Sequence, residues 1–242
     1  KLQHFGPRPR ADEPQNNALR LRAGLQASGL CMEAKQNQSN TKFSYQDALQ
    51  ARHEGDNLRS SEQYSDAAPK YLRAARSLVQ KTNTKEEASI VDALRVSLYC
   101  GYAQSMLDLV EGEGVTADGQ PFPMMFASEE DFMDFVFETL LKVEDALREA
   151  CAIQSDEKSL YFLAECLKQL ANFEGPGSYS YRGTPLDQAI RTAKMKEAHL
   201  CYKRILDAFP KGKKKSEAKN GMNEAVAFLW NQGIDKWTPE YV

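Results

Sequence analysis

The sequence predicts an all-α protein made of antiparallel helix hairpins, and three observations support this prediction. Apolar residues recur every three or four positions along most of the chain, which is the spacing of one helical face. Three of these stretches start with Ser or Thr followed three residues later by Asp or Glu, the pattern of a helix capping box. No stretch alternates β-branched and polar residues as a half-buried strand would.

The first three helices are predicted from their caps and apolar stripes. The first runs from Ser44 to about Leu58, and its serine is expected to accept a hydrogen bond from an early backbone N–H. The second begins near Ser65, so that Pro69 falls in the first turn, where its missing N–H would have had no partner. The third runs from Thr84, followed by Glu87, to about residue 110.

Four further helices complete the array. A strongly apolar one starts at Ser128 and ends near residue 153, and the next covers residues 160–173. The sequence Thr-Pro-Leu-Asp at 184–187 combines an N-cap, a proline at the first helical position and an acidic residue, so it predicts a helix start. That helix is expected to stop at Pro210, and the last spans about 216–230.

These elements divide the chain into a helical domain with two tails. Residues 1–43 are predicted to be an extended polar tail with one short helix, 44–232 the helical domain, and 233–242 a C-terminal tail. Two glycine- and proline-containing inserts, 111–127 and 174–183, are longer than ordinary helix connections. Their apolar and aromatic residues are candidate partner contacts: Phe122, Met124, Met125, Phe126, Tyr179 and Tyr181.

Composition and charge exclude several protein classes. With 42% hydrophobic and 27% charged residues, the chain is neither disordered throughout nor a disulfide scaffold. The net charge of -3 provides no overall positive field for nonspecific nucleic-acid binding. No apolar run is long enough to span a bilayer, so we expect a soluble or peripherally membrane-associated protein. The five scattered cysteines are expected to be buried thiols of a reducing compartment.

A spacing of small and aromatic residues resembles the tetratricopeptide repeat. Counting from Gly55, Tyr64 follows after nine residues, Ala67 after twelve, Tyr71 after sixteen and Ala74 after nineteen. The helix near the C-terminus has the second half of this pattern, with Ala198, Tyr202, Ile205 and Pro210. The resemblance implies a superhelical array of about three degenerate repeats and a terminal helix. A pentatricopeptide or fourteen-three-three-like array is the structural alternative.

The resemblance also implies where a partner would bind. In tetratricopeptide proteins the first helix of each repeat lines a concave groove that receives extended peptides or partner helices. The family's clamp for a C-terminal carboxylate has an asparagine after the glycine, whereas this chain has Asp56, whose charge would repel a carboxylate. A cochaperone function is therefore disfavoured. The expected groove residues are Arg52, Asp56, Arg59, Tyr102, Tyr161 and Lys168.

The sequence contains no recognisable catalytic or metal-binding constellation. Its histidines, His4, His53 and His199, lack partners at metal-ligand spacing, and no phosphate-binding or nucleophile motif is present. The carboxylates of 129–134 cluster at a helix start, where they favour the positive end of the helix dipole. We therefore expect no catalytic, cofactor-binding or metal-binding residues, and give an unrecognised enzyme site little weight.

The function expected from the sequence is that of a protein-protein interaction scaffold. The repeat core, inserts and tails suit an accessory subunit of a large assembly, in an organelle, foremost the mitochondrion, or in the cytoplasm, with other protein subunits as partners. One alternative is an RNA-associated subunit, such as an organellar ribosomal protein, in which a basic patch would contact phosphate. The other is an adaptor or cochaperone that binds extended peptides. The basic patch comprises Lys211, Lys213, Lys214 and Lys215.

Overall fold

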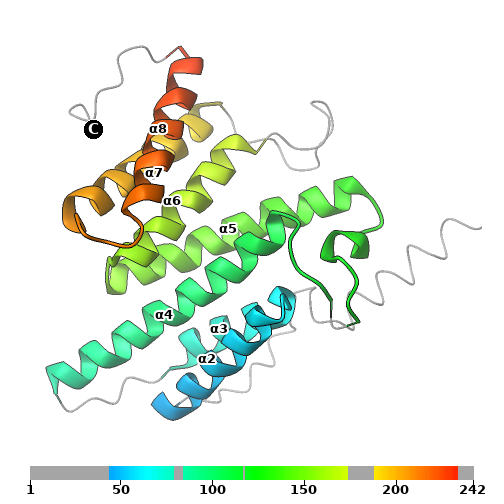
Figure 1. The fold of residues 1–242 in the computed structure, drawn as a ribbon, viewed down its shortest axis with the longest axis vertical. Coiled ribbons are helices and arrows are strands. Elements are labelled where there is room, and N and C mark those ends of the chain that lie inside the picture. Colours follow the sequence, from blue (N-terminus) through cyan, green and yellow to red (C-terminus); the bar gives the residue numbers. More distant parts are fainter. Residues whose placement is uncertain (1–43, 79–83, 117, 174–187, 234–242) are drawn as a thin grey trace, which may run out of the picture. The chain divides into compact units, whose positions relative to one another are not determined.

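The computed structural model describes residues 44–78, 84–116, 118–173 and 188–233, and these residues confirm the all-α class (Figure 1). They form seven α-helices and one short 3-10 helix, and an isolated β-bridge joins Val115 and Pro121. No helix among them is long and apolar enough to cross a membrane. The helices are α2 (Tyr45–Ser60), α3 (Tyr64–Ser77), α4 (Lys85–Val110), η1 (Phe122–Met125), α5 (Glu129–Ile153), α6 (Glu157–Asn172), α7 (Gln188–Ala208) and α8 (Lys215–Asn231).

The predicted helix starts are confirmed at three caps. Ser44 accepts a hydrogen bond from the backbone N–H of Asp47, whose carboxylate accepts the N–H of Ser44 in return. Thr84 and Ser128 accept in the same way from the N–H groups three residues later. A fourth cap, which the sequence analysis missed, is formed by Asp156 at the start of α6. Each cap satisfies a backbone donor that the first helical turn leaves without a partner.

The position predicted for Pro69 is wrong. Helix α3 begins at Tyr64, so Pro69 lies in the second turn, where a proline cannot donate the usual hydrogen bond to the carbonyl of Ser65. The helix continues through it to Ser77, because its apolar stripe is packed into the core: Ala67, Ala68, Tyr71, Leu72, Ala74 and Ala75 are buried. Tertiary packing thus outweighs the missing hydrogen bond.

Some predictions concern residues outside the described part of the chain. These are the tail with its short helix (1–43), the insert at 174–183 with Tyr179 and Tyr181, the helix start at 184–187 and the tail after residue 233. The helix predicted to follow 184–187 is present as α7 from Gln188 onward. The last helix, α8, agrees with the predicted range to within one residue at each end.

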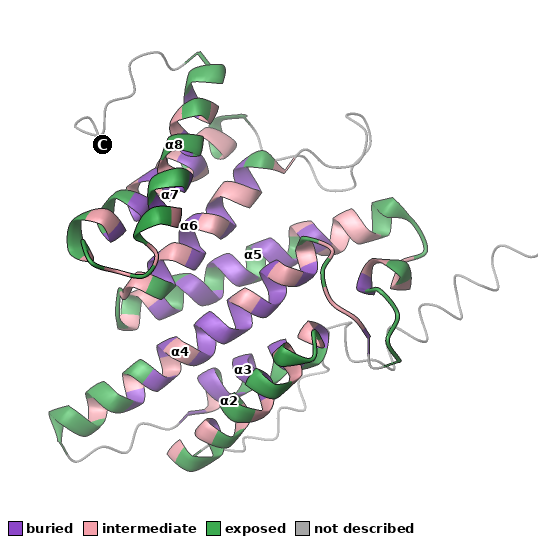
Figure 2. Ribbon diagram, viewed as in Figure 1, coloured by how far each residue is buried: buried purple, intermediate pink, exposed green. Residues whose placement is uncertain are grey.

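Each helix packs against the next one along the chain, and the even-numbered helices also contact one another. Besides the sequential pairs, α2 contacts α4, α4 contacts α6, and α6 contacts α8. Among the described residues the backbones of the odd-numbered helices α3, α5 and α7 do not approach one another in this way, although side chains of α5 and α7 form ion pairs. Figure 2 shows buried residues concentrated in α3, α4 and α6, whereas α2 and α8 are largely exposed. The even-numbered helices therefore line one continuous side of the array.

A tyrosine fills the helix crossing at each end of the array. The ring of Tyr71 lies so close to two glycines that a Cβ would be 2.6 Å from it at Gly55 in α2 and 2.7 Å at Gly101 in α4. Its hydroxyl donates to Asp56, at 2.6 Å. Small residues are required here because the helix backbones approach the ring closely.

Tyr202 in α7 repeats this arrangement at the other end. A Cβ on Gly221 of α8 would lie 2.4 Å from the Tyr202 ring, and the Tyr202 hydroxyl donates to Glu165 of α6, at 2.7 Å. In both cases the accepting carboxylate directly follows a small buried residue, which is Gly55 in α2 and Ala164 in α6. The two ends of the array therefore share a local geometry.

Candidate functional site

Three polar contacts join the even-numbered helices. Arg59 of α2 approaches Asp108 of α4, with Nη2 3.7 Å from Oδ2. Gln169 of α6 donates from Nε2 to the carboxylate of Glu111 at the end of α4, at 2.7 Å. Between α6 and α8, Lys168 Nζ lies 2.8 Å from Glu224. We call this side the even-helix face, and it comprises Arg52, Asp56, Arg59, Asp108, Glu111, Tyr161, Glu165, Lys168, Gln169, Lys214, Glu217 and Glu224.

Five of the six residues predicted to line the groove lie on the even-helix face. Arg52 is exposed and forms an ion pair of 3.8 Å with Asp56. Tyr161 is half-buried, with Lys214 Nζ 4.5 Å from the centre of its ring. Arg59 and Lys168 make the contacts between helices described above. The face therefore includes residues of α2 and of α6, two helices that each contact α4.

Tyr102 does not belong to this face, so its assignment to the groove is corrected. Its side chain is 1% exposed, and burial raises its pKa to about 12. Helix α4 is packed against α2, α3, α5 and α6, and residues on either side of Tyr102 are buried as well. A partner could not contact this ring without displacing the core.

The even-helix face carries more acidic than basic side chains. The face contains six carboxylates and four cations. The carboxylates belong to Asp56, Asp108, Glu111, Glu165, Glu217 and Glu224, and the cations to Arg52, Arg59, Lys168 and Lys214. Burial raises the pKa of Asp108, and the neighbouring Glu113 raises it further. The pKa of Glu111 is raised by burial and by the charges of Asp108 and Glu113. Burial is thus the main cause of both raised pKa values; Arg59 offsets part of it at Asp108, and the charges of Asp108 and Glu113 add to it at Glu111.

Sequence reasoning missed most of these carboxylates. Glu165 could have been found, because it follows Ala164 as Asp56 follows Gly55 at the equivalent crossing. Asp108 and Glu111 offered no such signal, because their importance comes from contacts with α2 and α6.

The first insert is folded onto the protein rather than free. The backbone N–H of Val115 donates to the carbonyl of Glu62, and Phe122 packs at ring-centre distances of 5.5 Å from Phe126 and 5.4 Å from Phe135. Phe122 is 0% exposed, so it anchors the insert and is not accessible to a partner. Of the predicted contact residues here, Met124 is 75% exposed, whereas Met125 and Phe126 are half-buried.

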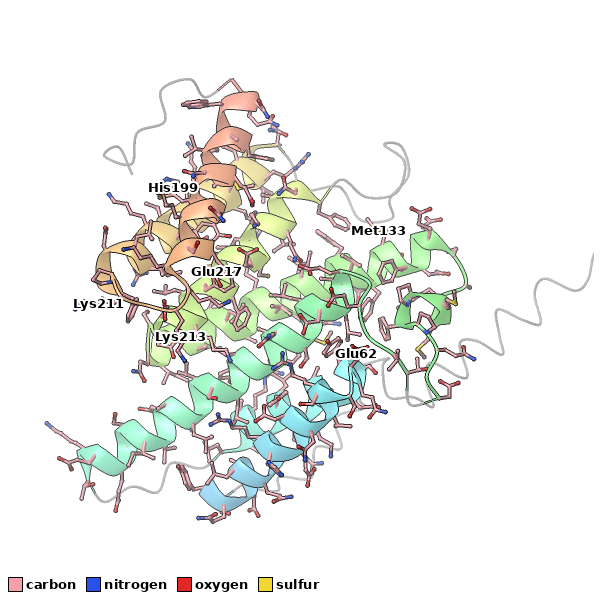
Figure 3. All side chains as sticks on the ribbon, in the orientation of Figure 1. Glu62, Met133, His199, Lys211, Lys213 and Glu217 are labelled. Carbon is pink, nitrogen blue, oxygen red and sulfur yellow. The ribbon has the colours of Figure 1, made fainter. Side chains whose placement is uncertain are left out.

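The predicted basic patch is divided by the fold. Lys211, Lys213 and Lys215 are exposed, and Figure 3 shows Lys211 and Lys213 at the loop between α7 and α8. Lys214 instead turns to the even-helix face and pairs with Glu217, at 3.2 Å. The backbone N–H groups of Lys213 and Lys214 donate to Glu157, which fastens this loop to the start of α6.

Burial disfavours the charged form of the cysteine side chains among the described residues. Burial raises the pKa of Cys100 and of Cys201 to about 12 and also raises that of Cys151 and Cys166. A raised pKa keeps these four free thiols protonated, whereas a nucleophilic cysteine needs a lowered one. In the part of the chain that the structure describes, no three His, Cys, Asp or Glu side chains are grouped to hold a metal ion.

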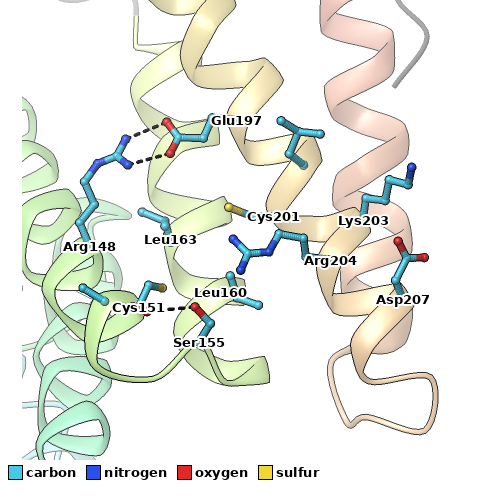
Figure 4. Close-up of a pocket in the computed structure, with 12 residues that line it drawn as sticks. Arg148, Cys151, Ser155, Leu160, Leu163, Glu197, Cys201, Lys203, Arg204 and Asp207 are labelled. Atoms are coloured by element: carbon cyan, nitrogen blue, oxygen red, sulfur yellow. Dashed lines mark hydrogen bonds and ion pairs between the residues drawn. The ribbon is translucent and has the colours of Figure 1, made fainter. Parts of the chain in front are cut away.

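A pocket of about 680 Å³ lies on another side of the array, between α5, α6 and α7 (Figure 4). Leu160 and Leu163 of α6 form apolar parts of its wall, and Arg204 of α7 reaches into it. None of its lining residues was predicted as a site residue, because they come from three helices and share no motif.

No protein-family model, curated protein or solved structure matches this chain.

Proposed function

We propose that this chain is a non-catalytic, tetratricopeptide-like scaffold that binds another protein along its even-helix face, as a subunit of a larger assembly. The observation that carries the proposal is the mutual contact of α2, α4, α6 and α8, which turns four separate helices into one extended surface. In helical-repeat proteins, stacked hairpins provide such surfaces for partners. The chemistry of the buried thiols favours binding over catalysis.

The two tyrosine crossings support a repeat architecture. Tyr71 and Tyr202 each occupy the position that the tetratricopeptide resemblance assigns to a large residue in a second helix. Each packs on a glycine of the following even-numbered helix and donates to a carboxylate of the preceding one. The same side-chain arrangement at both ends suits repeated units separated by inserts.

The charge of the even-helix face favours a basic partner segment. Its carboxylates outnumber its cations, and at Glu111 burial and the charges of Asp108 and Glu113 raise the pKa. A lysine or arginine from a partner would relieve that repulsion, whereas a C-terminal carboxylate would meet Asp56. We therefore place binding of a basic segment above a cochaperone-like function.

Native mass spectrometry and crosslinking of the protein purified from its source test this proposal. We expect copurifying subunits whose crosslinks map to α2, α4, α6 and α8. The variant Glu224→Lys should release them, because this side chain is 61% exposed and the change reverses a charge of the face. Glu138→Lys in α5 is the matched control and should retain them, because Glu138 is 71% exposed and lies outside the face. A free monomer, or crosslinks confined to other helices, would contradict the proposal.

RNA association is the alternative, favoured by the exposed side chains of Lys211, Lys213 and Lys215. Phosphate contacts make binding fall steeply with salt concentration. Replacing the three lysines by glutamine should then abolish a salt-sensitive affinity for RNA while leaving protein partners in place. Binding that is absent or insensitive to salt excludes this alternative.

A further inference from the structure

The pocket between α5 and α7 opens beside a pair of ionic bridges. Both helices pack on α6, and the half-buried Lys194 of α7 reaches Glu144 of α5, with Nζ 2.6 Å from Oε2. Arg148 lies 2.9 Å from the same glutamate and also forms two hydrogen bonds of 2.7 Å with Glu197 of α7. These bridges connect the two helices through side chains, and the pocket adjoins them.

The pocket has an apolar wall and a charged rim. Leu160, Leu163 and Cys201 line it and are no more than 5% exposed, so the wall is part of the core. At the rim, exposed Lys203 and Arg204 lie on the same helix as Asp207. Arg148 and Glu197 neutralise each other, so the remaining rim has two cations and one carboxylate.

Arg204 is the cation best placed to meet a ligand. Figure 4 shows its guanidinium reaching toward the space between Leu160 and Cys201, while the dashed lines run from Arg148 to Glu197 and between Cys151 and Ser155. No other described residue forms a hydrogen bond or ion pair with Arg204. A guanidinium presents donors in a fork that fits both oxygens of a carboxylate.

We propose that this pocket binds a small amphipathic carboxylate, with its aliphatic body against Ala152 and Leu200, above the buried Leu160 and Leu163, and its carboxylate on Arg204. The volume lies in the range of about 300–1,000 Å³ that is usual for small-molecule sites, and such sites combine apolar walls with a few polar groups. The excess of one positive charge at the rim disfavours an amine. This site is separate from the even-helix face and does not depend on its partner.

Decanoate, used below the concentration at which it forms micelles, is a suitable probe. Binding is measured by calorimetry and by the rate at which a maleimide modifies Cys151, read by peptide mass spectrometry. Cys151 lines the pocket and is only half-buried, so a bound ligand should slow its modification severalfold. We expect decanol and decylamine to bind at least about tenfold more weakly, as loss of a hydrogen bond to a charged group predicts.

Two variants and one control decide the assignment. Arg204→Gln should weaken decanoate binding by about tenfold or more, because it removes the charged fork. Ala152→Trp should fill the pocket from an exposed position and block both binding and the protection of Cys151. Arg76→Gln removes an exposed arginine from α3, outside the pocket, and should change neither. Circular dichroism of each variant verifies its fold.

The proposal is overturned if decanoate neither binds nor slows modification of Cys151. It is also overturned if decanol binds as tightly as decanoate, or if Arg204→Gln binds decanoate as Arg76→Gln does.

Discussion

At the scale of single residues, each helix crossing depends on a tyrosine ring that packs against a glycine. Tyr71 is 1% exposed and Tyr202 is 0% exposed, and burying a phenol is favourable only if its hydroxyl retains a partner. Asp56 and Glu165 supply these partners. The glycines opposite the rings let the next even-numbered helix approach.

Replacing Gly101 with alanine should destabilise the protein by about 1–3 kcal/mol, the usual cost of overpacking a core. Within an uncrowded helix this substitution would stabilise by about 1 kcal/mol, so the sign of the effect is diagnostic. The added Cβ would lie 2.7 Å from Cε1 of Tyr71. Urea unfolding measures the change, and in a Tyr71→Leu background the penalty should shrink. A stabilised Gly101→Ala variant would show that the crossing is not tight.

Protonation of His199 should make stability depend on pH. His199 is 3% exposed, and burial, together with the charge of Lys203, lowers its pKa to about 4. The unfolded chain takes up this proton near the ordinary pKa of about 6.5, whereas the folded protein resists it until about pH 4. The contribution of His199 to stability is therefore present at neutral pH and is lost as the pH falls through this window.

The expected loss between about pH 7 and pH 5 is about 2 kcal/mol of unfolding free energy. Urea titrations of the native protein and of His199→Gln at both pH values measure it. The difference between the two proteins should isolate the histidine from the carboxylates that titrate in the same range. An equal pH dependence in both would exclude His199 as its source.

At the scale of elements, the insert between α4 and α5 behaves as part of the fold. Phe122 is held in a cluster of rings with Phe126 and Phe135, while Met124 in the same 3-10 helix is exposed. The glycine and proline content correctly predicted a long break between helices. It did not indicate which apolar residue points inward, because a short irregular segment has no periodicity from which to infer a buried face.

Phe122→Ala should cost about 3–5 kcal/mol or unfold the insert locally, because it leaves a cavity among aromatic rings. Met124→Ala in the same 3-10 helix is the matched control and should change stability by less than about 0.5 kcal/mol. Urea unfolding gives the global effect, and hydrogen exchange across residues 114–126 reports local opening. Equal effects of the two variants would mean that Phe122 is not an anchor.

At the scale of the whole described array, stability should be distributed between neighbouring helices. Helix α8 contacts α7 and α6, and buries Ala225 and Leu229 in a cluster with Ala171 and Met195. In repeat arrays each unit is stabilised mainly by its neighbours. The destabilisation caused by removing a terminal helix should therefore decrease with distance from that helix along the array.

Deleting residues 215–242 should accelerate hydrogen exchange in α6 and α7 while leaving protection in α2 and α3 nearly unchanged. The comparison is made by mass spectrometry on the full chain and the truncated one. Alanine at the exposed Lys215 serves as a control for the terminal region and should leave protection intact. Uniform loss of protection from α2 to α7 would indicate a single cooperative unit instead of an array.

The sequence by itself determined the helices of this protein, and the tertiary structure decided how they form sites. Caps such as Ser44 and Ser128 are local interactions, so the starts of α2 and α5 follow from a few neighbouring residues. Burial of Tyr102, the approach of Arg59 to Asp108 and the pocket at Arg204 depend on segments far apart in the chain. Helical periodicity shows which residues share a stripe, but not which neighbouring helix will cover it. That choice is made only when all the helices pack together.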